Sequence, residues 1–183
     1  QIELSSKLYK DKEAVTKLIN KITAANPTND VIMASSVIEE SDMELLKRKY
    51  ALTQGNIRTS IIRGYGIYKG LCANCHGDVG QGLKDIAPPL ANSPRAMSKN
   101  QQIPINILLH GLEGPVGEKD YGVMISMKNN DDVWISDVLN YVRMDFGGIT
   151  NRVSQSTVKK IREKFKDRDQ SWTIKELEAE MIH

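Results

Sequence analysis

Both cysteines of this chain lie in one pentapeptide, Cys72-Ala73-Asn74-Cys75-His76. Two intervening residues turn the backbone so that both thiols reach one edge of a flat ring, and C-x-x-C-H is the spacing used for covalent haem attachment. The thiols would form thioether bonds with the porphyrin, while the imidazole of His76 would bind the iron. The motif therefore predicts one covalent haem c, attached through Cys72 and Cys75, with His76 as an iron ligand.

A zinc site and a redox dithiol are two other uses of paired cysteines, and the rest of the sequence argues against both. A structural zinc ion usually takes four Cys or His ligands. The chain has two cysteines and three histidines, and His110 and His183 are far from the motif in sequence. A thioredoxin-like dithiol follows a strand in an alternating pattern of strands and helices, which this sequence lacks.

The residues after the motif suit a chain that bends round a bulky ligand. Glycines recur at Gly77, Gly80 and Gly82, where backbone close to a flat group needs conformational freedom. The segment Ala87-Pro88-Pro89-Leu90 follows, and its prolines stiffen the loop. Because proline has no amide hydrogen, carbonyls of this loop stay free, and we expect one to accept a hydrogen bond from His76.

Together, the motif, the glycine turn and the proline loop resemble class I cytochromes c. The resemblance continues upstream, where Gly64 and Tyr68 stand at the family's positions for a small residue and an aromatic in the first helix. Downstream, residues 107–116, 121–124 and 132–143 are similar to the cytochrome domains attached to periplasmic dehydrogenases of bacteria. The resemblance covers about half of the chain. It implies an all-α class I cytochrome c fold around one haem.

The resemblance also implies a methionine as the sixth iron ligand. Counted back from the last core helix, Met124 stands at the family's usual offset, whereas Met127 falls too late. The family usually has proline after this methionine and this chain has Ile125, so Met127 stays an alternative. His110 as ligand would give a bis-histidine haem of lower potential. Its apolar stretch, which ends before a glycine, instead favours a partly buried histidine at a helix end.

Hydrophobic periodicity predicts helices along the whole chain, in three parts. Residues 1–57 form an N-terminal extension whose apolar positions predict a helical hairpin over residues 8–46. The cytochrome c domain is expected to span residues 58–148. Residues 149–183 form a helical tail.

Capping signals place the ends of several of these helices. In the cytochrome domain we expect helices over residues 59–74 and 103–109, with Gly64 allowing the first helix to approach Tyr141 of the last. Asp131 or Asp132 would cap that last helix, and Gly147-Gly148 would end it. In the tail, Thr173 and Glu176 have the spacing of a capping box.

Charge and hydropathy exclude other classes of function. The formal net charge is +2, and two haem propionates would bring it near neutral, which gives no argument for nucleic acid or an acidic membrane surface. No run approaches the roughly 18 apolar residues of a membrane span. Because the family's haem is attached outside the bacterial cytoplasm, the resemblance implies an exported, periplasmic protein whose export signal was removed or lies upstream.

The functional prediction is an electron carrier rather than an enzyme. With His76 and Met124 both bound, the iron would keep one low-spin geometry in both oxidation states. The expected partners are a donor dehydrogenase and a downstream acceptor, with this chain a domain or fragment of a larger protein. Two alternatives stay open: a peroxidase or gas-binding protein with an open sixth position, and an interaction module whose hairpin and tail bind a dehydrogenase.

Overall fold

The computed structural model describes residues 42–180. The chain divides into two compact units, Gln1–Ala51 and Leu52–His183. In the first unit, residues 42–49 form a helix. Apart from its last residues, the helical hairpin predicted over residues 8–46 lies outside the described part of the chain.

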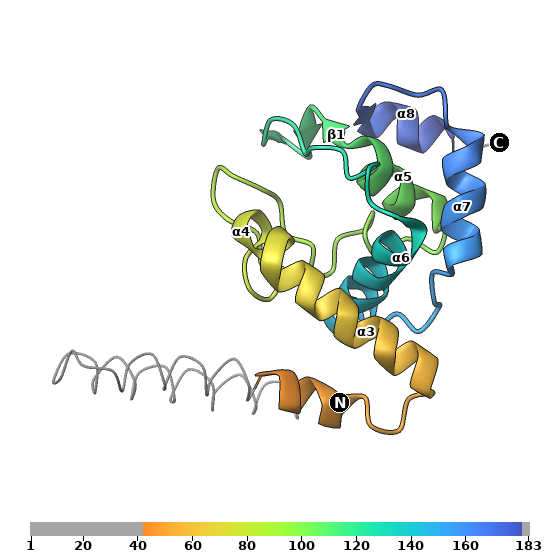
Figure 1. The fold of residues 1–183 in the computed structure, drawn as a ribbon. Coiled ribbons are helices and arrows are strands. Elements are labelled where there is room, and N and C mark those ends of the chain that lie inside the picture. Colours follow the sequence, from red (N-terminus) through yellow and green to blue (C-terminus); the bar gives the residue numbers. More distant parts are fainter. Residues whose placement is uncertain (1–41, 181–183) are drawn as a thin grey trace, which may run out of the picture. The chain divides into compact units, whose positions relative to one another are not determined.

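The second unit consists mainly of helices, with four strands of two residues each among its described residues (Figure 1). Its helical elements are α3 (Gly55–Ile67), η1 (Tyr68–Cys72), α4 (Ala73–His76), α5 (Gln102–His110), α6 (Asp132–Tyr141), η2 (Val142–Phe146), α7 (Gln155–Lys164) and α8 (Ile174–Ala179). Both η1 and η2 are single π-helical turns. The strands are β1 (Leu112–Glu113), β2 (Pro115–Val116), β3 (Lys119–Asp120) and β4 (Trp172–Thr173). The helical fold predicted from the sequence is confirmed, and the short strands are additions to it.

Helices α3 and α6 pack closely at Gly64. A Cβ atom at this position would lie 2.0 Å from the carbonyl oxygen of Asp137 and 2.8 Å from Cβ of Tyr141. The ring of Tyr141 in turn contacts the rings of Tyr65 and Tyr68, with centroids 5.5 Å apart in both pairs. The predicted approach of the first helix to the last, with Tyr141 as the partner, is therefore confirmed.

A buried polar network joins α3, α6 and the start of the tail. Ser60 Oγ donates to one carboxylate oxygen of Asp137 at 2.6 Å, and Arg63 Nε donates to the other at 2.5 Å. Asn140 Nδ2 donates both to Ser60 Oγ and to the carbonyl of Val153. The amide of Val153 donates back to Asn140 Oδ1 at 2.8 Å. Since polar groups in a core are stable only when paired, this network fixes how the three segments meet.

The predicted helix ends are found in the structure. Asp131 is the N-cap of α6, where its side chain accepts a hydrogen bond from the amide of Trp134 at 2.8 Å. The π-helical turn η2 ends at Phe146, directly before Gly147-Gly148. Thr173 and Glu176 form the full capping box at the start of α8.

The tail, here residues 149–180, packs against helices that precede it in the chain. Helix α7 contacts α5 and α6 (Figure 1). Strand β4 pairs in parallel with β1, so that Trp172 lies opposite Leu112 and Thr173 opposite Glu113. None of the helices in residues 42–180 combines the length and the apolar character needed to cross a membrane.

Candidate haem-binding site

The Cys-x-x-Cys-His motif lies at the end of a nearly continuous helical run. Helix α3 begins at Gly55, earlier than the predicted Thr59, and passes through η1 into α4. Cys72 is the last residue of η1, and Cys75 and His76 are the last two residues of α4. π-Helical turns inside helices are frequent at functional sites. Local helix geometry alone therefore brings two thiols and an imidazole within about one turn of each other.

The two thiols are free, with Cys72 half-buried and Cys75 exposed. Burial raises the pKa of the Cys72 thiol to about 11, so this sulfur is protonated at neutral pH. Within residues 42–180, no three His, Cys, Asp or Glu side chains gather so that they would hold a metal ion. In the described part of the chain, the two thiols therefore lack the further protein ligands that a structural zinc site would need.

The imidazole of His76 is buried and held in a fixed orientation. Its Nδ1 atom lies 2.9 Å from the carbonyl oxygen of Pro88, which confirms the predicted acceptor in the proline loop. Burial lowers the pKa of His76, so the ring is neutral near pH 7. A neutral ring that donates through Nδ1 keeps a lone pair on Nε2. His76 therefore has the tautomer and the orientation that a metal-binding histidine needs.

The loop that carries Pro88 is closed on itself by backbone hydrogen bonds. The amide of Gly82 donates to the carbonyl of His76 at 2.8 Å, and the amides of Leu90 and Ala91 donate to the carbonyl of Gly80. Gly82 has a φ of 76°, and a Cβ atom there would lie 2.7 Å from the nitrogen of Pro89. Only glycine fits this conformation and this space. The loop is thus a fixed support for the imidazole of His76.

Met124 lies in a separate segment, next to the strand that follows α5. Its backbone pairs with Leu112 in an antiparallel bridge, with hydrogen bonds of 2.8 and 3.1 Å. Its half-buried side chain packs against a core cluster of Leu112, Trp172 and Leu177. The alternative ligand, Met127, is also half-buried, and its amide donates to the carbonyl of Leu108 at 2.8 Å.

His110 resembles His76 in its local structure but lies among aromatic side chains. It is the last residue of α5, it is buried, and its Nδ1 atom lies 3.1 Å from the carbonyl oxygen of Arg168. The rings of Phe165 and Trp172 each lie 6.4 Å from the His110 ring. Burial lowers the pKa of His110, and its Nε2 atom is enclosed without a hydrogen-bond partner among residues 42–180. The third histidine, His183, lies outside the described residues.

Arg143 is a buried charge that the sequence analysis did not single out. Its side chain is 1% exposed, and Nη1 donates to the carbonyls of Ala96 and Ser98 at 2.8 Å each. Its Nε and Nη2 atoms have no partner among the described residues, and burial lowers its pKa. The sequence signal is the position of Arg143 directly after Tyr141 and Val142, two residues that the structure shows to be buried.

The residues present fit a haem group. The two thiols supply attachment points, the Nε2 atom of His76 supplies an iron ligand, and a haem brings two carboxylates that match the unpaired donors of Arg143. Large apolar side chains are exposed on both sides of the proposed ligands. They are Leu71, Val79 and Ile86 around the motif, and Val123 and Ile125 around Met124.

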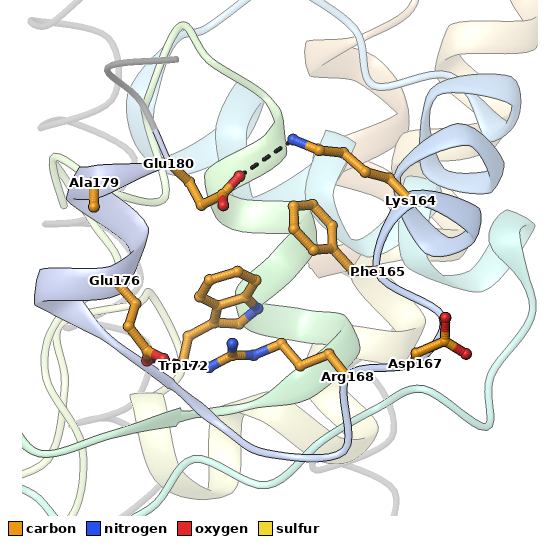
Figure 2. A pocket seen from close by; sticks show the side chains of 8 residues that line it. All are labelled: Lys164, Phe165, Asp167, Arg168, Trp172, Glu176, Ala179 and Glu180. Carbon is orange, nitrogen blue, oxygen red and sulfur yellow. Dashed lines mark hydrogen bonds and ion pairs between the residues drawn. The ribbon is translucent and has the colours of Figure 1, made fainter.

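A pocket of about 490 Å³ lies on the tail rather than at the motif (Figure 2). It is lined by Lys164, Phe165, Asp167, Arg168, Trp172, Glu176, Ala179 and Glu180. Ion pairs join Lys164 to Glu180 and Arg168 to Glu176 across it. Four of its five charged side chains are therefore already paired with one another.

Comparison with known proteins identifies relatives of the chain. The family model described as cytochrome c matches residues 61–144. Cytochrome c-552 of Thermus thermophilus is 34% identical over 102 residues, which are 52% of this chain and 68% of that protein. The cytochrome c subunit of the quinone-dependent alcohol dehydrogenase of Gluconacetobacter polyoxogenes is 29% identical over 121 residues, 61% of this chain. The same alignment spans about a quarter (24%) of that subunit's length.

Proposed function

Since this chain belongs to the cytochrome c family, with a class I fold and one covalent haem c, we propose that Cys72 and Cys75 carry the haem and that His76 and Met124 ligate its iron. The family makes the protein an electron carrier rather than an enzyme. The observation that supports the proximal ligand best is the 2.9 Å contact between His76 Nδ1 and the Pro88 carbonyl. That contact leaves the lone pair of Nε2 in the same ring available, and the neighbouring Cys72 and Cys75 would place the haem iron next to it.

Met124 is preferred to Met127 because it stands at the family's usual offset from the last core helix, α6; the backbones of both residues are held by hydrogen bonds. Met124 is fixed on both its amide and its carbonyl by Leu112, and the flanking residues Val123 and Ile125 are exposed. Met127 donates its amide to Leu108 at the carboxyl end of α5, and its carbonyl accepts from Asn130 in the turn that leads to α6. The paired strand gives Met124 one defined backbone position, as a permanent ligand requires.

The bound haem supplies a one-electron couple, and the protein supplies its orientation and surroundings. The Pro88 carbonyl holds the His76 ring and increases the basicity of Nε2, and a thioether sulfur at the sixth position raises the reduction potential. We assign propionate pairing to Arg143, whose buried charge lacks a carboxylate partner among the described residues. These residues keep the site in one arrangement while an electron enters and leaves.

We also propose that the electron donor is a dehydrogenase, as in the relatives that are subunits of alcohol dehydrogenase. The cytochrome domain would be residues 58–148, with residues 1–57 and 149–183 as extensions, in an exported, periplasmic protein. Docking of the donor would be brief and would take place near Cys72 and Cys75, where the haem is attached.

Absorption spectra of the reduced holoprotein, before and after addition of carbon monoxide, test this assignment. We expect no prompt change in the low-spin spectrum, because a bound methionine blocks the gas until it leaves the iron. The Met124→Ala variant should bind carbon monoxide promptly, whereas the matched variant Met127→Ala should not. Prompt binding by the unmodified protein would favour the peroxidase or gas-binding function instead. Gas binding by Met127→Ala alone would transfer the ligand role to Met127.

A further inference from the structure

We infer that the tail positions the sixth iron ligand, with Trp172 as the residue that holds Met124 in place. This inference rests on the proposed His76 and Met124 ligation and goes beyond it. It gives residues 149–180, which lie outside the segment that matches the family model, a role in setting the properties of the haem.

A three-stranded arrangement of backbone links the tail to Met124. Leu112 of β1 pairs on one side with Met124, through hydrogen bonds of 2.8 and 3.1 Å. On the other side β1 pairs in parallel with β4, where Trp172 lies opposite Leu112. The amide of Trp172 also donates to the carbonyl of Gly111 at 3.1 Å. The backbone of Met124 is therefore attached to the tail through a single intervening strand.

Gly111 shows how closely the two segments approach. Its φ is 86°, and a Cβ atom there would lie 2.4 Å from the carbonyl oxygen of Met124 and 3.2 Å from Oγ of Ser171. Gly111 therefore lies between the segment that contains Met124 and the tail, and it is close to both. The spacing between Met124 and Ser171 depends on the absence of a side chain at this position.

Side-chain packing connects the same residues. Met124 and Trp172 belong to one apolar cluster, together with Leu112 and Leu177. Trp172 is 3% exposed, and the guanidinium carbon of Arg168 lies 3.6 Å from the centre of its ring (Figure 2). Stacking of this kind stabilises both groups. Arg168 therefore stacks on the indole of Trp172, which is one of the three residues of the cluster against which Met124 packs.

The tail also holds the residues that follow Met124. Arg162 donates to the carbonyls of Lys128 and Asn130, at 2.6 and 2.8 Å, and to the carboxylate of Asp132 at 2.8 Å. Lys128 in turn pairs with Asp169 at 3.2 Å. The segment from Met124 to the start of α6 is therefore restrained at two separate places by residues of the tail.

The physical consequence concerns how often the methionine leaves the iron. A loop that opens locally releases its ligand without unfolding the protein, and the frequency of opening depends on the local contacts. This loop has Ile125 where the family usually has a stiffening proline, and Ile125 is 66% exposed. The pairing of Met124 and Trp172 with the same residue, Leu112, and the packing of Met124 against the cluster that contains Trp172 provide the restraint that the sequence of the loop itself does not.

The test uses the full holoprotein with Trp172→Ala, and Ile161→Ala as the control. Ile161 is a buried residue of α7, outside the cluster that contains Met124. Three properties are measured: the rate of carbon monoxide binding to the reduced protein, the methionine-to-iron absorption band of the oxidised protein, and the urea midpoint of global unfolding. A further variant, Trp172→Leu, keeps an apolar side chain if the alanine variant does not fold.

We expect Trp172→Ala to bind carbon monoxide about tenfold faster than the unmodified protein and to lose the methionine band well below the urea midpoint. Trp172→Leu should lie between the two. Ile161→Ala should lower the midpoint without a separate effect on the band or on gas binding. If the Trp172 variants, like Ile161→Ala, change the gas-binding rate and the methionine band only as far as their lower urea midpoint accounts for, the tail is merely structural and the inference is wrong. If the unmodified protein lacks the methionine band, the ligand assignment fails first, and the inference with it.

Discussion

His76 and His110 occupy nearly identical local structures. Each is the last residue of a helix and is 8% exposed. Each is followed by a glycine with positive φ, 77° at Gly77 and 86° at Gly111. Each has Nδ1 next to a backbone carbonyl, and burial lowers both pKa values. A helix end, a glycine and a carbonyl acceptor are therefore a general way to orient an imidazole, and they do not by themselves make a metal ligand.

The two sites differ in what surrounds the ring. His76 has Cys72 and Cys75 within the preceding turn, and the proline loop is its support. His110 has Phe165 and Trp172 around it, and its Nε2 atom is enclosed by protein. The role of each histidine therefore depends on the groups around it. The ring of His76 is available to bind a ligand, whereas the ring of His110 packs in the core.

The strongest test of this contrast replaces each histidine by alanine. We expect His76→Ala to yield no six-coordinate, low-spin haem spectrum, because an iron ligand is missing. His110→Ala should keep the spectrum and lose stability instead, since a buried ring is removed. Visible spectra of both purified proteins check this. A normal spectrum for His76→Ala together with a lost one for His110→Ala would reverse the assignment.

The glycines that follow the histidines should respond differently to alanine. In Gly111→Ala the new Cβ would lie 2.4 Å from a backbone oxygen, that of Met124, whereas in Gly77→Ala it would meet the side chain of Gln81, which can move. Both variants carry the strain of positive φ, about 1 kcal/mol or more. We expect Gly111→Ala to cost more, by about 1–3 kcal/mol, in urea unfolding. Gly66→Ala, where no atom of the described residues lies within 4 Å of the new Cβ, is the control and should be neutral or stabilising. Equal losses for the first two variants would contradict this account.

The capping box of α8 follows directly after Trp172, whose ring lies next to His110. Its removal should have a moderate effect on the free energy of unfolding. Thr173→Ala removes the acceptor for the amide of Glu176 and is expected to cost about 1 kcal/mol of unfolding free energy. Thr173→Ser keeps the hydroxyl and should restore most of it. Because α8 follows β4 directly, the loss should appear first as faster amide exchange in the tail. Uniform acceleration over α3 and α6 would instead show that the tail does not open on its own.

The smallest expected effect is the pH dependence that His110 contributes. Its pKa is lowered by burial, so the unfolded chain takes up a proton more readily than the folded one. Stability from this group is present above the unfolded pKa of about 6.5 and is lost as the pH falls from there toward the lowered folded pKa. Urea midpoints between pH 8 and 5 should show a decline that is reduced in His110→Gln. An unchanged decline in that variant would assign the effect to other groups.

Much of the haem site was predictable because its signals are local. The motif, the glycines and Pro88 all lie within residues 72–88. The prolines of this loop have no amide hydrogen and leave carbonyls free, which predicted the hydrogen bond from His76. The contact of Gly64 with Tyr141 is distant in sequence, and it was predicted because the resemblance to class I cytochromes c implied it. The caps at Asp131 and Thr173 followed from capping patterns of three residues.

Other features were missed because they depend on which distant segments meet. The π-helical turn at Tyr68–Cys72 has no periodic signal. Arg143 appeared to be one charge among many until its burial was known. The pairing of β1 with β4 joins two strands of two residues each, which is too short for an alternating pattern to be recognised.

The sequence by itself determined the covalent haem attachment and the family, since adjacent residues carry that chemistry and their spacing is fixed by the backbone. The tertiary structure alone decided the surroundings of the two histidines and the close association of the tail with Met124. Residues 112, 124 and 172 are far apart in the chain and meet only because packing of α5, α6 and α7 brings their backbones together. Such contacts are set by the shape of the whole core, which no local pattern contains.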